Sequence, residues 1–146
     1  MNTPVKFELA KLLKEKGFDV PVLSCYFQKD EVSENYSIIN QYEIEYIEDK
    51  GNFILIPYNE NYRSLYLDKI NFNGWGDLTF SAPTIAAVVM WLYEKHGIWI
   101  SVTLSNGLFW WEVMNNEKKF LPLGKNSHSP TKAYEAAVSY ILNNLI

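Results

Sequence analysis

The pair Asn106-Gly107 lies between two apolar runs in the stretch IWISVTLSNGLFWWEVM, residues 98–114. Asn-Gly is the favoured pair for a two-residue type I′ turn, because both positions take a positive φ. Such a turn predicts an antiparallel hairpin with three apolar cross-strand pairs on one face. These pairs are Ile100 with Val113, Val102 with Trp111, and Leu104 with Phe109. We predict that this face lies on the core.

The opposite face of the predicted hairpin has a mixed composition. A slip of the register by one residue would exchange the two faces, so the register is well determined. The opposite face then carries Trp99, Ser101, Thr103, Trp110, Glu112 and Met114.

A helix over about residues 84–96 precedes the hairpin. It begins at Pro83 or Thr84, since proline is tolerated in a first helical turn and threonine is a capping residue, and it ends at Gly97. It is apolar nearly all round, which is typical of a helix hidden on most sides. We therefore predict a central core helix packed on the sheet. Its stripe is Ile85, Val88, Val89 and Leu92, and Ala86, Met90 and Tyr93 occupy much of the rest.

Two further helices are indicated at the ends of the chain. The first ends at Gly17, and the last begins with Ser129 as N-cap and Pro130 at the first helical position. The first helix has an apolar stripe of Val5, Leu9, Leu12 and Leu13. Its opposite side is a basic face that we expect in water, with Lys6, Lys11, Lys14 and Glu15. The stripe of the last helix is Tyr134, Val138, Ile141 and Leu145.

Strand patterns fill much of the region between the first two helices. Residues 20–27 alternate, so Leu23, Cys25 and Phe27 share one side. Residues 42–58 indicate a second hairpin with its turn at 49–52, and strands are expected near residues 65–67 and 78–80. This order predicts an α+β fold with a mainly antiparallel sheet and about three helices, in a single domain over residues 1–146.

The charge is unevenly distributed along this chain of net charge −4. Residues 30–60 hold eight acidic residues and one lysine, a net charge of −7, whereas the remainder carries +3. Such a segment suits a basic protein partner, or it simply keeps a hairpin edge in solution. The acidic total makes a phosphate-backbone binder an unfavoured class, so nucleic acid is not the expected partner.

The single cysteine, Cys25, excludes an internal disulfide. The first residues lack the pattern of a signal peptide, and the longest apolar run, residues 85–93, is too short to cross a bilayer. We therefore expect a cytoplasmic protein with no membrane partner. The oligomeric state is left open.

No residue is assigned a catalytic role. Phosphate loops, dinucleotide fingerprints, nucleophile elbows and metalloprotease motifs are missing from the sequence. Cys25 should point inward, and His96 suits the end of its helix as a cation. Two histidines and one cysteine fit no zinc spacing, so we predict no metal and no cofactor. Glu43 and Glu45 share one strand face, where they are either binding residues that could hold a hard cation or merely solvated.

The aromatic residues are the best candidates for binding. Trp99 and Trp110 lie on the hairpin face away from the core, and Trp75 lies in a glycine loop. Exposed aromatic rings beside hydroxyl groups suit stacking on bases, sugars or a partner protein. The alternative is that another helix covers this face in a three-layer core.

Three segments resemble a family of small proteins of unknown function encoded by phages and prophages of gut Bacteroidetes. They are LAKLLKEKGFDVP at residues 9–21, SAPT-x-A with WLYEKHGIWISV in residues 81–102, and SPTKAYEAAVSYILNNLI at residues 129–146. The likeness covers both ends and the central helix and hairpin, but not residues 24–79. It carries over no activity. It implies a mobile-element protein that acts in a bacterial cytoplasm.

These observations lead to one main functional hypothesis. It is a non-enzymatic binding or accessory protein of a phage or mobile element that uses the tryptophans Trp75, Trp99 and Trp110, the acidic hairpin with Glu43 and Glu45, or both. The alternative is a small hydrolase or nucleotide-processing enzyme with a site of carboxylates and tyrosines. A third reading is nucleic-acid binding through stacked tryptophans.

Overall fold

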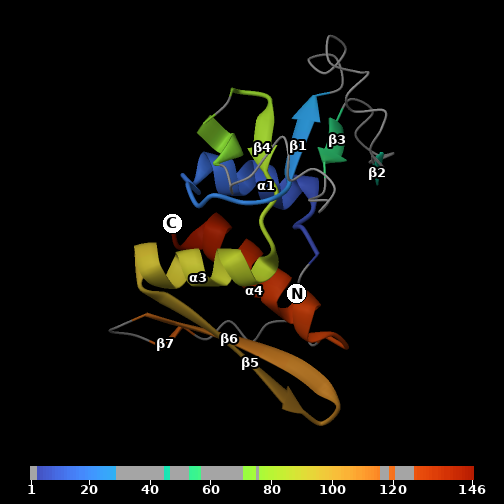
Figure 1. Cartoon of the computed structure of the whole chain (residues 1–146). Helices are drawn as coiled ribbons and strands as arrows, with labels where there is room; N and C mark the ends of the chain where they lie inside the picture. Colours follow the sequence, from blue (N-terminus) through green and yellow to red (C-terminus); the bar gives the residue numbers. More distant parts are fainter. Residues whose placement is uncertain are drawn as a thin grey trace. The chain divides into compact units, whose positions relative to one another are not determined.

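The structure is a computed structural model that describes residues 3–28, 45–46, 53–56, 71–74, 76–115, 119–120 and 127–146. These residues form three α-helices and two antiparallel sheets, so the α+β prediction is confirmed (Figure 1). The chain divides into two compact units, Pro4–Pro83 and Thr84–Ile146, and the second unit also includes Thr3. That they belong to one domain stays a prediction.

The N-terminal unit, Pro4–Pro83, contains a four-stranded sheet in the order β2-β3-β1-β4. Neighbouring strands are antiparallel, and β2 and β3 pair in the antiparallel sense of the predicted hairpin, with Glu45 opposite Leu55. The turn of that hairpin and the strand expected near residues 65–67 lie outside the described residues. The elements are α1 (Phe7–Glu15), β1 (Cys25–Gln28), β2 (Glu45–Tyr46), β3 (Phe53–Ile56), the 3₁₀ helix η4 (Phe72–Gly74) and β4 (Thr79–Ser81).

Helix α1 packs on the sheet through an aromatic residue that the predicted stripe missed. The ring of Phe7 makes edge contacts with Tyr26 of β1 at 5.3 Å and with Phe80 of β4 at 5.4 Å. The buried residues of the helix are Phe7, Ala10 and Leu13, whereas the predicted Leu9 and Leu12 are half-buried. The stripe prediction was therefore wrong in part. The spacing of the leucines does not show which side of the helix packs against an aromatic cluster.

The end of α1 agrees with the prediction for Gly17. Gly17 has a φ of +79°, and the Phe18 N–H donates to the Leu13 carbonyl, which closes the helix. The basic face is not wholly in water: Lys14 Nζ donates to the carbonyl oxygens of Gly76 and Thr79 and lies 4.9 Å from the Phe80 ring centroid. Lys14 thus links helix α1 by hydrogen bonds to β4 and to the segment that precedes it.

Strand β1 is buried on both sides, which differs from the predicted alternation. Cys25 and Tyr26 are both buried, and the Tyr26 hydroxyl donates to the Val5 carbonyl at 2.8 Å. Leu23 precedes the strand and is 42% exposed, so the expectation that it shares the burial of Cys25 is wrong. A strand that is covered on both faces does not show period-two patterning.

The C-terminal unit, Thr84–Ile146, has two helices on one face of a three-stranded sheet of order β5-β6-β7. Helix α3 packs on β5, α4 packs on β5 and β6, and the two helices contact each other (Figure 1). The predicted packing of the central helix on a sheet is therefore confirmed. The elements are α3 (Ile85–His96), β5 (Ile98–Ser105), β6 (Leu108–Asn115), β7 (Lys119–Phe120) and α4 (Pro130–Asn144).

The hairpin of β5 and β6 has the predicted register throughout. Val102 lies opposite Trp111, and Asn106 and Gly107 in the turn have φ values of 51° and 76°. Only the part of the inner face near the helices is fully buried. Leu104, which lies near the turn on the same face, is 60% exposed. The expectation that all six inner residues face the core is therefore wrong at the outer end of the hairpin.

Helix α3 is less enclosed than its composition suggested. Thr84, not Pro83, is its N-cap, and Val88 and Leu92 are fully buried as predicted. Met90 and Tyr93, however, are 47% and 49% exposed. The prediction of a helix hidden on most sides is wrong for this surface.

Helix α4 begins at Pro130 as predicted, with Ser129 as N-cap. Tyr134 and Leu145 of its predicted stripe are only half-buried, because the buried side is centred on small residues that allow close packing. The buried residues are Ala133, Ala137, Val138, Ile141 and Leu142. Among the described residues, no helix combines the length and apolarity needed to cross a bilayer.

Candidate functional site

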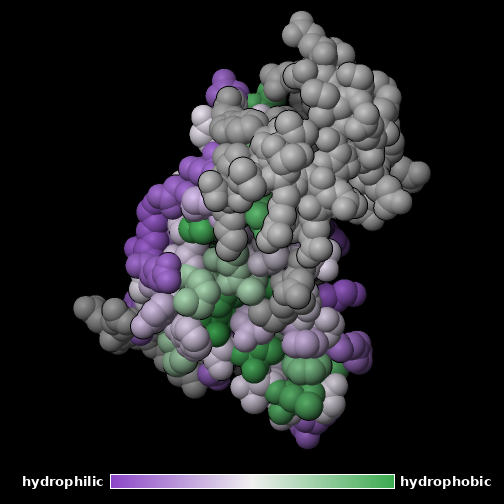
Figure 2. All heavy atoms as spheres, viewed as in Figure 1, coloured by the Kyte–Doolittle hydropathy of each residue, from purple (hydrophilic) through white to green (hydrophobic). Residues whose placement is uncertain are grey.

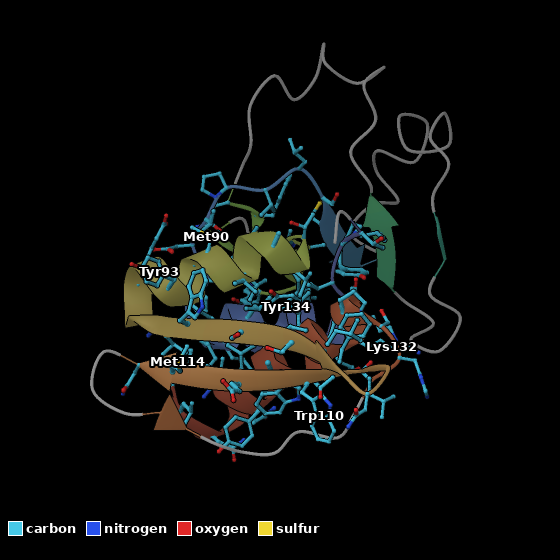
Figure 3. All side chains as sticks on the ribbon, turned by 90° about the horizontal axis from the view of Figure 1, so that it is seen from below. Met90, Tyr93, Trp110, Met114, Lys132 and Tyr134 are labelled. Carbon is cyan, nitrogen blue, oxygen red and sulfur yellow. The ribbon has the colours of Figure 1, made fainter. Side chains whose placement is uncertain are left out.

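The outer face of the β5–β6 hairpin carries the two predicted tryptophans that the structure describes. We call this surface, formed by Trp99, Ser101, Thr103, Trp110, Glu112 and Met114, the tryptophan face. Helices α3 and α4 pack on the other face of the sheet, where Ile100, Trp111 and Val113 are buried. Within the described ranges no helix lies on the tryptophan face, so a covering third layer is not found there (Figure 3).

Trp99 is an exposed residue of the tryptophan face, and it lies beside an exposed residue of α3. Its side chain is 43% exposed, and its ring lies edge-on to that of Tyr93, with 5.4 Å between the centroids. Tyr93 comes from the last turn of α3, one turn after Met90 (Figure 3). The exposed aromatic surface therefore continues from the strand onto the helix.

Trp110 is half-buried and is held against the end of the hairpin. Its indole Nε1 donates to the Ser105 carbonyl at 3.3 Å, and it lies opposite Thr103. Trp99 and Thr103 are four residues apart on β5, which corresponds to about 14 Å along a strand. The two indoles are too far apart to sandwich one base or sugar between them.

The remaining predicted binding residues are described only in small part. Trp75 and Glu43 lie outside the described residues. Glu45 is in β2, where its backbone lies opposite Leu55, but its side chain is not among those described. Binding through the acidic hairpin therefore stays a prediction.

Cys25 has the inward orientation that was predicted. It is buried in β1, and this burial raises the pKa of its thiol far above the ordinary value. A thiol that stays protonated is a poor nucleophile, since the thiolate is the reactive form. Among the described residues, no three His, Cys, Asp or Glu side chains come together as metal ligands.

His96 is at the end of α3, but not as the favoured cation that was predicted. Its ring packs edge-on against Trp91 at 4.8 Å, and its Nε2 is buried with no hydrogen-bond partner among the described residues. Burial, and then the positive charge of Lys95, lower the pKa of His96. The lowered pKa disfavours the charged form of His96, so the prediction of a stabilised cation is wrong.

Comparison with known proteins identifies no relative. No family model, no curated protein and no solved structure matches the chain.

Sequence reasoning missed the contribution of α3 to this surface. Met90 and Tyr93 were predicted to belong to a helix that is buried on most sides. The same apolar composition is also expected of a helix that leaves an apolar stripe exposed, and this was the signal that could have identified the two residues. Their spacing of three residues places them on one side of the helix. The candidate site is therefore the tryptophan face together with Met90 and Tyr93.

Proposed function

We propose that the chain is a non-enzymatic binding or accessory protein of a phage or mobile element, which uses the tryptophan face to hold a protein partner in a bacterial cytoplasm. The observation that carries the proposal is the exposure of Trp99 on the outer face of the hairpin, where its ring meets that of Tyr93 from α3, which is also exposed. A large aromatic side chain left in water favours burial against a partner.

The composition of the face supports a protein as the partner. Tryptophan, tyrosine and methionine are enriched at protein interfaces, and tryptophan and tyrosine dominate their binding energy. Glu112 lies in the middle of the face, opposite Ser101. Its charge, like that of the acidic segment 30–60, favours a basic partner over a polyanion.

The proposal predicts that substitution of Trp99 by alanine weakens partner binding without unfolding the chain. The test compares proteins retained from a bacterial host lysate by the wild type and by Trp99→Ala at low salt. Loss of an interface tryptophan commonly costs about 2 kcal/mol or more, so we expect at least roughly a tenfold loss of affinity. Leu23→Ala in the other unit is the matched control, since Leu23 is 42% exposed.

Two results would contradict this proposal. One is that the wild type retains no protein at low salt. The other is that a retained partner binds Trp99→Ala and Leu23→Ala equally well. Titration with a single-stranded oligonucleotide serves as the counter-test, and we expect no quenching of tryptophan fluorescence.

A further inference from the structure

Strand β5 lies at an edge of its sheet. In the order β5-β6-β7, only one side of β5 is paired, and among the described residues nothing pairs with its other side. The strand is eight residues long, Ile98–Ser105. An edge of this length presents backbone donors and acceptors to any extended chain that approaches it.

The register shows which backbone groups point away from β6. The Phe109 N–H and carbonyl bond to Ser127, so they point away from β5, and the pair Leu104–Phe109 is not hydrogen-bonded. Hydrogen-bonded and non-bonded pairs alternate along an antiparallel ladder. The N–H and carbonyl groups of Ile100, Val102 and Leu104 therefore point out of the sheet at its free edge.

Nothing in the sequence of β5 blocks pairing at this edge. Natural edge strands are usually protected by charged residues, proline or a bulge. Strand β5 has no charged residue and no proline, and its ladder with β6 is continuous over eight pairs. Apolar surface is also exposed at the outer end of the hairpin, where Leu104 lies (Figure 2).

We propose that the free edge of β5 binds an extended segment of the partner protein as an added strand. The inference rests on the proposed binding function and gives it a recognition mode, in which main-chain hydrogen bonds supply affinity and alternate side chains supply specificity. The segment pairs with Ile100, Val102 and Leu104, and its outward side chains extend the tryptophan face beside Trp99.

The charges around the edge define the chemistry of this segment. Side chains of the segment that face the helices are expected to be uncharged. A charge there would lose its hydration, and β5 has no charged residue to pair with it. On the outer face, the residue opposite Ser101 lies two strand spacings, about 10 Å, from Glu112. A lysine or arginine there can reach across the small serine to Glu112. The expected segment is therefore β-branched or aromatic, free of proline, and basic at one outward position.

A second copy of the chain fits this edge less well than a single segment. Two copies paired antiparallel through β5 are related by a two-fold axis perpendicular to the sheet, which places both helix layers on the same face. Helix α3 packs on β5 and runs along the β5 side of the hairpin (Figure 3). The second α3 would have to enter the space that this helix layer occupies, whereas a lone strand brings no helix.

The test uses the full chain and a displayed library of random ten-residue peptides. Peptides selected on the wild type are expected to share the chemistry described above. Backbone amide exchange measured by NMR, with the best peptide bound, should slow at least tenfold at Ile100, Val102 and Leu104. The amides of Ser101 and Thr103 are already bonded to β6 and should change little.

Two pairs of variants separate the edge from its surroundings. Leu104→Pro removes an outward N–H without breaking the ladder to β6, and should weaken the peptide at least tenfold, whereas the control Leu104→Val should keep its affinity. Glu112→Gln should weaken a lysine-bearing peptide several-fold but not its glutamine counterpart. Thermal unfolding of each variant shows whether the fold is retained. If Leu104→Pro does not fold, the amide pattern in the wild type decides.

The outcomes distinguish this inference from the proposed function. Failure to select any peptide, or protection of no outward amide by the selected one, would overturn the strand addition. Slow exchange of these amides in the absence of peptide would also overturn it, because the edge would then already be covered. If that exchange slows further as the protein concentration rises, the edge is covered by a second copy of the chain. If a lysate partner no longer binds Trp99→Ala but still binds Leu104→Pro, the proposed binding function stands and the inferred strand addition at the β5 edge is contradicted.

Discussion

At the scale of single residues, the two helices of the C-terminal unit begin with different caps. The Thr84 hydroxyl accepts a hydrogen bond from the Ala87 N–H at 3.3 Å, which is the usual capping bond. Ser129 makes no such bond with its side chain. Its N–H instead donates to the Ser127 hydroxyl at 3.2 Å. The sequence signals look alike, but only one hydroxyl caps its helix.

This difference predicts unequal costs of substitution. Thr84→Ala should lower the free energy of unfolding by about 1 kcal/mol, the typical value for a lost cap. Ser129→Ala should cost less than about half as much, because no capping bond is lost. Urea unfolding of the two variants measures both values, and equal costs would contradict the assigned caps.

The buried environment of His96 predicts a pH-dependent stability. Its pKa is lowered from the ordinary 6.5 in the folded chain, so the unfolded chain binds more protons as the pH falls through that value. The free energy of unfolding contributed by His96 is therefore present above pH 6.5 and is lost as the pH decreases.

His96→Gln should reduce this dependence, and His128→Gln, at an exposed position, is the control variant. Urea unfolding at pH 7.5, 6.5 and 5.5 provides the measurement. Parallel loss of stability in the wild type and in His96→Gln would show that carboxyl groups, not His96, govern the effect.

At the scale of elements, the β5–β6 turn determines the hairpin. Gly107 has a φ of +76° and an added Cβ would meet no atom within 4 Å, so the cost of a side chain there is purely conformational. Gly107→Ala should lower the free energy of unfolding by about 1–2 kcal/mol, the cost of a left-handed alanine.

Gly76→Ala is the matched control. Gly76 also has open space around it but no positive φ, so the substitution should be close to neutral. Calorimetry of both variants tests the prediction. Equal effects would mean that the turn does not need its left-handed glycine.

Helix α3 shows that the composition of a helix does not by itself predict how much of the helix is buried. Its composition indicated a helix covered on most sides, but it packs against β5 and α4 and leaves Met90 and Tyr93 in solvent. Composition reports how much apolar surface an element has. Its neighbours decide how much of that surface is covered.

At the scale of the whole molecule, the passage between the two units is short. Only residues 82–84 separate the end of β4 from the start of α3. Domain boundaries normally fall in flexible linkers, for which three residues leave little room.

We therefore expect one cooperative unfolding transition, in keeping with the predicted single domain. Differential scanning calorimetry of the full chain should give a calorimetric enthalpy equal to the van't Hoff enthalpy. Two resolved transitions would instead assign Pro4–Pro83 and Thr84–Ile146 to separate domains.

The sequence alone determined the features that depend on local chemistry. The Asn106-Gly107 turn and alternation of period two predicted every pair of the β5–β6 ladder, and Gly17 and Gly97 marked the ends of α1 and α3. The same register identified the face on which Trp99 and Trp110 lie. These features follow from φ preferences and from the alternation of side chains, which act within a few residues.

Only the tertiary structure decided which apolar residues are covered. It separated the strands into two sheets, buried Cys25 and Tyr26 on opposite sides of β1, and left Tyr93 and Leu104 exposed. It also left the tryptophan face without a helix over it in the described part of the chain. Burial depends on contacts between segments far apart in the sequence, and no local pattern records which segments meet.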